Sequence, residues 1–428
     1  MKWLESRAER TFPECGGLPP SCRWGKLASS RNAGKAALLM TVTALMFPTA
    51  RLFPAAGSLY AADVKGATKP ARDASLLNES RHSIDRALNW LDGRQGEDGS
   101  WCQHSAITAL AVAGYLGSGE EKYGRSNPKV AKALAFVRSK ANKDGSIGEG
   151  PEMVYTTSIC LMALLAAGDP ADGGIIRGAR QYLLTAQADE GEGLAPDDPS
   201  YGGFGYAKAA ENAEQRRADL SNTQWALEAL KFSEFVESAP DNIRAGEKDE
   251  AGSSLHWDKA IAYLSRCQNA ETNPDKPAHN DGGFFYRHGE SKAGISTEGG
   301  LRSYGGMTYA GLKSMVYARL DRDDPRVMAA WKWINERYTL DENPGLGVQG
   351  LYYYYHTFAK AHQVYGLETF KTPDGKVHDW RAEFVNKLVS IQKGDGFWVN
   401  ENGRWWENMP ELTTAYCVLA LEVANSGW

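Results

Sequence analysis

An excess of positive charge, regularly spaced cysteines and long apolar runs are all lacking in this sequence of 428 residues. The formal net charge is −5, so the basic surface that nucleic acids need is not expected and nucleic acid is not a predicted partner. The 6 cysteines show no C-x-x-C spacing, which argues against a zinc ribbon or a disulfide framework. The apolar run at residues 36–47 is too short for a comfortable membrane span.

The first 62 residues differ from the rest of the chain. A basic stretch ending at Lys35 precedes the apolar run, and small residues follow it at 55–57 and 61–62. That order is typical of a secretory signal, with a single N-terminal anchor as the alternative. We therefore expect residues 1–62 to be a signal sequence or anchor and residues 63–80 to be a linker. The body of the protein is expected to be exported to the periplasm or another extracytoplasmic space.

From residue 81 onward one pattern recurs six times. Each repeat has a helical segment, a glycine-rich turn with an aromatic residue, and a second helical segment. In the first repeat the turn runs from Gln95 to Trp101, and in the last it runs from Gln392 to Trp398. No single helical hairpin can bury its apolar face alone, so the repeats must stack. The sequence predicts an all-α fold, an (α/α)6 toroid of six helical hairpins over residues 81–428. Outer helices would face solvent and inner helices would line a central cavity.

The turns carry a specific resemblance. The Q-x3-G-x-W pattern at residues 95–101 and 392–398 resembles the repeat of squalene and oxidosqualene cyclases. The Gly-Gly-Phe segments at 202–204 and 282–284 are similar to repeats of the protein prenyltransferase β subunit. Tyr355-His356-Thr357 resembles the zinc-ligand segment of the same subunit. The resemblance implies the same toroid, with the Gln and Trp residues bracing its turns. It implies an activity much less strongly.

Asp219-Leu-Ser-Asn-Thr223 occupies the place of the Asp-x-Asp-Asp-Thr acid motif of hopene-type cyclases. Asp219 and Thr223 match, whereas Ser221 stands at the proton-donating position. A serine hydroxyl is far too weak an acid to protonate an alkene. Standard protonation is therefore expected to be lost, and Asp219 is either a helix N-cap or a non-standard acid.

His356 matches the histidine ligand of the prenyltransferase zinc site. The Asp-x-Cys that should lie upstream is absent, and one histidine does not hold zinc. No metal or cofactor is therefore expected, and His356 is either a candidate catalytic residue or a buried, hydrogen-bonded residue that lines the cavity. Two further carboxyl groups, Glu298 and Glu407, are candidate acids, although a surface loop is the alternative for both. The spacing of His279, Asp281 and His288 gives only a weak metal signal.

Aromatic residues on or beside the inner helices predict a surface for an isoprenoid or other apolar small molecule, because ring faces stabilise carbocations. The alternative is that they only fill the ring. The candidate substrate-binding residues are Trp225, Tyr304, Tyr309, Tyr353, Phe358, Trp405 and Trp406.

Three functions remain open. The first is an enzyme similar to terpene cyclases that acts on a prenyl or squalene-like lipid. The second is a non-catalytic isoprenoid-binding protein, and the third is a carbohydrate-active toroid. The last would need a pair of carboxylates across a groove, and none stands out. Peripheral contact with a membrane is also left open.

Overall fold

The computed structural model describes residues 72–207, 217–234 and 256–428, which belong to one compact unit. The predicted signal or anchor at 1–62 and the first half of the predicted linker, residues 63–71, lie outside the described residues. The first helix among the described residues, α2 (Ala74–Asp92), begins inside the segment predicted to be a linker, because the Asp73 side chain accepts the Ser75 N–H and caps it. In the part of the chain that is described, no helix has both the length and the apolar character needed to cross a bilayer.

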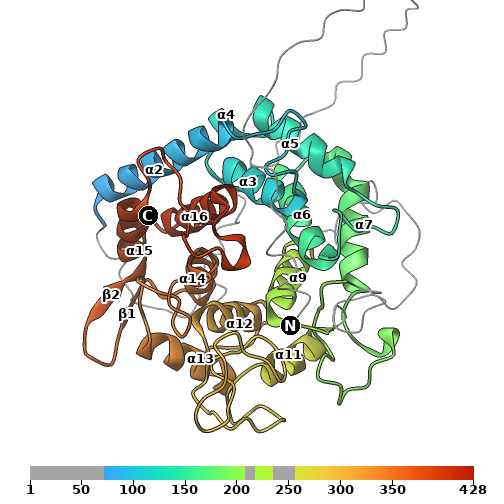
Figure 1. Ribbon diagram of the computed structural model, residues 1–428, viewed down its shortest axis with the longest axis vertical. Coiled ribbons are helices and arrows are strands. Elements are labelled where there is room, and N and C mark those ends of the chain that lie inside the picture. Colours follow the sequence, from blue (N-terminus) through green and yellow to red (C-terminus); the bar gives the residue numbers. More distant parts are fainter. Residues whose placement is uncertain (1–71, 208–216, 235–255) are drawn as a thin grey trace, which may run out of the picture. The chain divides into compact units, whose positions relative to one another are not determined.

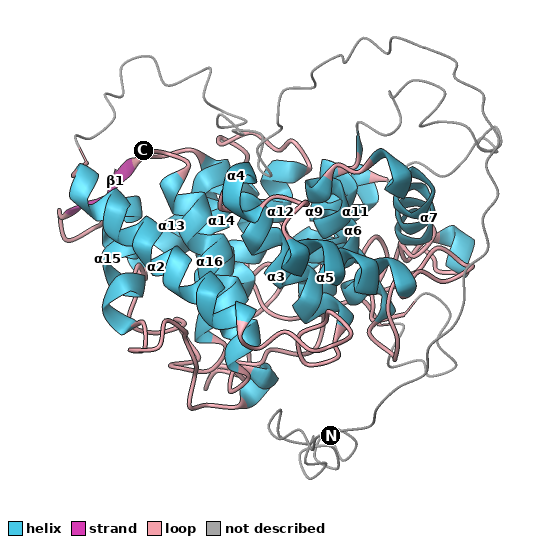
Figure 2. Ribbon diagram, turned by 90° about the horizontal axis from the view of Figure 1, so that it is seen from above, coloured by secondary structure: helices cyan, strands magenta, loops and turns pink. Residues whose placement is uncertain are grey.

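Two concentric rings of helices make up this unit (Figure 1). The outer helices are α2 (Ala74–Asp92), α5 (Pro128–Ser139), α7 (Gly173–Leu184), α11 (Trp257–Arg266), α13 (Pro325–Glu336) and α15 (Trp380–Ile391). The inner helices are α3 (Ser105–Gly117), α6 (Met153–Ala167), α9 (Leu220–Phe232), α12 (Gly305–Tyr317), α14 (Leu351–Tyr365) and α16 (Pro410–Asn425). Long loops lie along one edge of the rings when they are seen from the side (Figure 2).

Shorter elements join these helices. They are the one-turn helix α4 (Glu120–Tyr123), the 3-10 turns η1 (Pro170–Asp172), η2 (Glu190–Glu192) and η4 (Arg404–Trp406), and the strands β1 (Thr369–Lys371) and β2 (Val377–Asp379). The two strands pair antiparallel, with Phe370 opposite His378.

Burial explains which helices lie inside. Every residue of α12 is buried, and so are nearly all residues of α14 and α16. A helix that is buried on all sides belongs in a core. The outer helix α11 instead buries a single stripe of Ala260, Tyr263, Leu264 and Ser265. The core therefore lies within and between the two rings.

The ring is closed. Each inner helix packs on the next in chain order, and α16 packs on α3. Gln392, in the last turn, donates to the Ser83 carbonyl of α2 at 2.9 Å and accepts from the Ser83 hydroxyl at 2.9 Å. The all-α toroid of six hairpins predicted from the repeats is confirmed.

The glutamine that recurs in the turns makes the same two hydrogen bonds in several repeats. The Gln95 amide donates to the Gly99 carbonyl of its own turn and to the Lys129 carbonyl at the start of the next outer helix, both at 2.9 Å. Gln187, Gln268 and Gln392 make the same pair of bonds in their own repeats. The glutamine thus ties each turn to the neighbouring hairpin.

Candidate functional site

Asp219 caps α9 and is fully buried. Its Oδ1 accepts the Asn222 backbone N–H at 2.9 Å, and its Oδ2 accepts the Asn222 side-chain amide at 2.8 Å. The cap expected from the sequence is therefore formed. An acid role for the same carboxyl stays a prediction.

Burial raises the pKa of the Asp219 carboxyl above its ordinary value, although hydrogen bonds from Asn222 and Tyr286 and the charge of Arg287 oppose the shift. The Tyr286 hydroxyl lies 3.2 Å from the hydroxyl of Tyr206. Asp219 is thus a carboxyl with a strengthened hold on its proton, surrounded by phenols.

The other residues of the 219–223 segment have structural partners. The Thr223 hydroxyl accepts the Phe204 backbone N–H at 3.0 Å. Thr108, Thr157, Thr308 and Thr414 accept the corresponding turn N–H in other repeats. Ser221 lies 3.4 Å from the Tyr353 hydroxyl, oxygen to oxygen. Thr223 therefore belongs to the repeat, and its match to the acid motif carries little information about catalysis.

Glu407 is buried at the N-terminus of α14. Its Oε1 accepts the Tyr353 backbone N–H at 2.8 Å, and the carboxyl is also hydrogen-bonded by the backbone N–H groups of Tyr352 and Leu351 in the first turn of that helix. Its Oε2 accepts the Asn400 amide at 2.8 Å. Burial raises the pKa of Glu407 to about 7, and these hydrogen bonds only partly oppose the shift. Glu407 is therefore a buried carboxyl at the N-terminus of an inner helix, as Asp219 is, and the surface-loop alternative does not hold for it.

His356 is fully buried on α14, between the rings of Trp225 and Tyr416 at centroid distances of 5.1 Å and 5.3 Å. Burial and the nearby Lys360 and Lys313 ammonium groups hold the pKa of His356 well below its ordinary value, so the ring is neutral. Among the described residues, no group of three or more His, Cys, Asp or Glu side chains could hold a metal.

Glu298 lies apart from these residues. It is exposed in the loop that precedes α12, and its backbone N–H is bonded to the Ser296 hydroxyl. In the same insertion, Asp281 accepts the Trp333 indole N–H and the Ser303 hydroxyl, while His288 pairs with Asp275. The structure thus brings Asp219 and His356 into the interior of the ring and leaves Glu298 on the surface.

The predicted aromatic residues fall into two groups. Trp225, Tyr304, Tyr309 and Phe358 are buried, and Tyr353 is partly so; they pack among the inner helices. Trp405 and Trp406 are 40% and 47% exposed in η4, where both have positive φ. The buried group contacts its own members, for example Tyr309 and Phe358 at 5.2 Å. An aromatic-lined central cavity stays a prediction.

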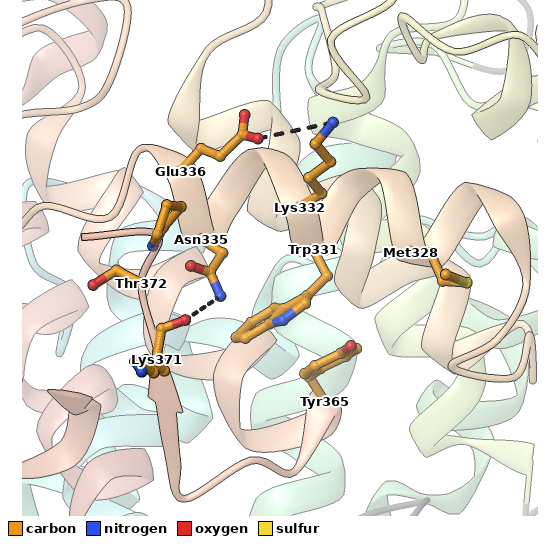
Figure 3. Close-up of a pocket in the computed structure, with 9 residues that line it drawn as sticks. Met328, Trp331, Lys332, Asn335, Glu336, Tyr365, Lys371 and Thr372 are labelled. Atoms are coloured by element: carbon orange, nitrogen blue, oxygen red, sulfur yellow. Dashed lines mark hydrogen bonds and ion pairs between the residues drawn. The ribbon is translucent and has the colours of Figure 1, made fainter. Parts of the chain in front are cut away.

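One hollow of about 480 Å³ lies on the outside of the ring (Figure 3). It is bounded by α13 and the residues around β1, with Trp331 stacked on Tyr365 at 4.3 Å. None of the predicted site residues lines it.

A cluster of charges inside the ring was missed from the sequence. Glu228 pairs with both Lys313 and Lys360, and all three are buried. The sequence feature that could have predicted this cluster is a charged residue within an otherwise apolar inner-helix segment, such as Glu228 in Trp-Ala-Leu-Glu-Ala-Leu.

The profile of the squalene-hopene cyclase C-terminal domain family matches residues 106–288, which include α9. The squalene–hopene cyclase of Bradyrhizobium diazoefficiens is 28% identical over 242 residues, covering 49% of this chain and 33% of that protein. The probable squalene–hopene cyclase of Sinorhizobium fredii is 27% identical, covering 49% of this chain and 34% of its own length. The match thus spans about a third of the length of these curated relatives.

Among solved structures, a variant of the type II terpene cyclase MstE from Scytonema, in complex with the product merosterolic acid A, has a TM-score of 0.51. The likeness covers 83% of this chain and 99% of that chain at 13% identity. At that identity the likeness concerns the fold. The protein therefore has a terpenoid cyclase-like fold, and its middle segment is similar in sequence to squalene–hopene cyclases.

Proposed function

We propose that this protein is a terpene cyclase-like enzyme that acts on a prenyl or squalene-like lipid, with Asp219 as its acid. The observation that carries the proposal is the buried Asp219 carboxyl at the N-terminus of α9, within the segment that matches the cyclase profile. A carboxyl whose proton is held more tightly by burial can act as the proton donor in a site without water.

In this reaction the Asp219 O–H bond breaks and a C–H bond forms at a terminal alkene carbon, which leaves a carbocation on the ligand. Tyr353 lies beside Ser221, and Tyr155 lies 3.2 Å from Tyr416, hydroxyl to hydroxyl. The faces of these rings would stabilise the cation. The cyclised cation then loses a proton to solvent, and the Asp219 carboxylate takes up a proton from solvent, so the net reaction is an isomerisation.

The test incubates the full chain with squalene and shorter isoprenoid alcohols and identifies products by mass spectrometry. We expect cyclic products from the native protein and a loss of at least about 100-fold in Asp219→Asn, because the amide has no acidic proton. Asparagine caps helices as well as aspartate does, and the unpartnered Asn222 Oδ1 can accept its amide after a flip. The variant should therefore stay folded.

Glu298→Gln is the matched control, because Glu298 is exposed and should not affect product formation. Glu407→Gln tests the buried carboxyl of Glu407 in the same way. Cyclic products from Asp219→Asn at the native rate would contradict the proposal and, if Glu407→Gln lost them, would assign the acid to Glu407.

A non-catalytic isoprenoid-binding protein is the second candidate. It is favoured by Ser221, which occupies the position of the usual proton donor. Unchanged lipid recovered from the purified protein would support it. The absence of any bound or altered lipid would reopen the carbohydrate alternative.

Export remains part of the proposal, because it rests on residues 1–62 alone. Cell fractionation, together with sequencing of the mature N-terminus, tests it. Recovery of the intact chain from the cytoplasm would contradict it, whereas recovery with membranes would favour the anchor or peripheral contact.

A further inference from the structure

Asp219 is enclosed by the fold, so a proton that it gives up cannot return to it directly from water. The residue is 0% exposed at the N-terminus of α9. A buried group exchanges its proton with solvent either through hydrogen-bonded neighbours or by a local opening of the fold. The polar groups between Asp219 and the surface therefore decide how the carboxyl recovers its proton.

Two tyrosines come to Asp219 from equivalent turns. The glycine-rich turns of two neighbouring repeats both read Gly-Gly-Phe-x-Tyr and end at Tyr206 and Tyr286. The Asp219 N–H donates to the carbonyl of Phe204 in the first turn at 3.1 Å. The N–H of the next residue, Leu220, donates to the Tyr286 carbonyl in the second turn at 2.9 Å. These two bonds hold the N-terminus of α9 against both turns.

The hydroxyl groups of these tyrosines are connected in series to the carboxyl. The Tyr286 hydroxyl is hydrogen-bonded to the Asp219 carboxyl and lies 3.2 Å from the Tyr206 hydroxyl, oxygen to oxygen. Exposure rises along the series, because Asp219 is 0% exposed, Tyr286 is 7% exposed and Tyr206 is partly exposed. A hydroxyl can accept one proton while it donates another. The series therefore connects the buried acid with a residue that reaches solvent.

Both phenols are neutral in the resting protein. Burial and the nearby Asp219 charge raise the pKa of Tyr206 and of Tyr286 above the ordinary value. Neither hydroxyl therefore stores a charge of its own, and each is suited to pass a proton on.

We propose that Tyr206 and Tyr286 return a proton from solvent to Asp219 after each protonation step. The proposal rests on the proposed function, in which Asp219 is the acid. A hydronium ion gives one proton to the Tyr206 oxygen, Tyr206 passes its own hydroxyl proton to Tyr286, and Tyr286 passes its own to the Asp219 carboxylate. Each phenol gains one O–H bond and loses one. The net change is that a hydronium ion becomes water and the carboxylate becomes a carboxylic acid.

Infrared spectroscopy of the full chain tests this path without any ligand. The carbonyl stretch of a protonated carboxyl shifts when deuterium replaces its hydrogen, and the band that Asp219→Asn removes belongs to Asp219. We expect Tyr286→Phe and Tyr206→Phe to slow deuterium uptake at Asp219 by at least about tenfold after rapid mixing with deuterium oxide, because a local opening must then replace the path. Both variants keep their rings, so the contact of Lys292 Nζ with the Tyr286 ring, at 4.1 Å from its centroid, can remain.

Tyr201→Phe is the matched control. Tyr201 is 7% exposed, as Tyr286 is, and its hydroxyl donates to Glu190. Deuterium uptake at Asp219 should keep the native rate in this variant. A fold that is merely loosened would exchange faster, so slower exchange separates a proton path from a structural role. If Tyr286→Phe does not fold, Tyr206→Phe decides the test by itself.

Native exchange rates in the phenylalanine variants would overturn the proposal. A native chain in which Asp219 has no protonated band would overturn both the proposal and the acid role of Asp219. Product formation by the native chain is read separately. Cyclic products together with unchanged exchange in the variants would sink this inference alone, whereas slowed exchange without products would sink only the proposed enzyme activity.

Discussion

Glu407 shows how a single residue joins stability to the chemistry of the site. Its carboxyl caps the N-terminus of α14, where unpaired N–H groups favour a negative charge, yet burial favours the neutral form. Burial is the larger effect, so the group titrates near pH 7 in the folded protein. Asp219 has the same conflict at the N-terminus of α9.

This conflict predicts a pH dependence of stability. The folded-state pKa of Glu407 is about 7 and the ordinary value is 4.5, so between these values the folded chain binds more protons than the unfolded chain. The contribution of Glu407 is therefore full below about pH 4.5 and falls by roughly 3 kcal/mol as the pH rises past 7. Urea unfolding of the native chain and of Glu407→Gln at pH 5 and pH 8 measures it.

The difference in unfolding free energy between the two proteins should change by that amount from pH 5 to pH 8, in favour of the variant at pH 8. Asp219 and Glu422 also have raised pKa values and act in the same direction in both proteins, so they cancel in the comparison. A difference that stays constant with pH would show that Glu407 is ionised throughout.

At the scale of the element, the turns decide how the hairpins meet. Gly202 has φ of 88°, and a Cβ placed on it would lie 1.9 Å from the Lys259 carbonyl oxygen of the next outer helix. Gly396 has the same role at the closing turn, where a Cβ would lie 2.7 Å from the Arg86 carbonyl oxygen. The glycine of the repeat is therefore required both by its backbone conformation and by the close approach of the next helix.

We expect Gly202→Ala to lower the unfolding free energy by about 3 kcal/mol or more, since it adds a steric clash to the cost of a left-handed backbone. Gly193→Ala is the matched control, because Gly193 has φ of 77° and nothing lies within 4 Å of its added Cβ. The control should lose only about 1 kcal/mol. Equal losses in the two variants, measured by chemical unfolding, would show that the close approach is absent in solution.

At the scale of the whole molecule, closure joins the two ends of the described chain. Arg72 donates to Glu368 at 2.6 Å and to Asp379 at 2.9 Å, and its side chain is 4% exposed. It also donates to the Gly427 carbonyl near the C-terminus. With Gln392 and Ser83, these contacts hold α2 against α15 and complete the outer ring.

Arg72→Met should therefore loosen the closure. We expect a loss of about 2–4 kcal/mol, because the change removes the ion-pair partner of Asp379 and leaves the partly buried Glu368 with Arg381 alone. Hydrogen exchange should accelerate first in α2 and α15. Lys122→Met removes an exposed pair with Asp85 and should cost less than about 1 kcal/mol. Faster exchange spread evenly over all the helices would mean that the ring opens as one unit and not at this seam.

Much of the fold could be predicted because the turn chemistry repeats in the sequence. Two of the four glutamine braces were found at Gln95 and Gln392, where the glycine follows four residues later. Gln187 and Gln268 were missed, because insertions separate them from the turn glycines Gly202 and Gly282 to which they bond. A spacing pattern cannot follow a contact across a loop of variable length.

The site was less accessible to prediction than the fold. The cap made by Asp219 could be expected, because an N-cap depends on a few residues of local sequence. The burial of Glu407 and the pairing of Lys313 with Glu228 could not, because each depends on residues far apart in the chain.

By itself the sequence determined the helices, their pairing into hairpins and the number of hairpins, because apolar periodicity and turn residues act over short distances. Only the tertiary structure decided that α16 meets α3, that two lysines share one glutamate inside the ring, and that Glu298 lies outside it. Burial determines how tightly an acid holds its proton and what a charge costs. Burial is a property of the closed ring. Every hairpin contributes to it, and no single hairpin could bury these groups alone.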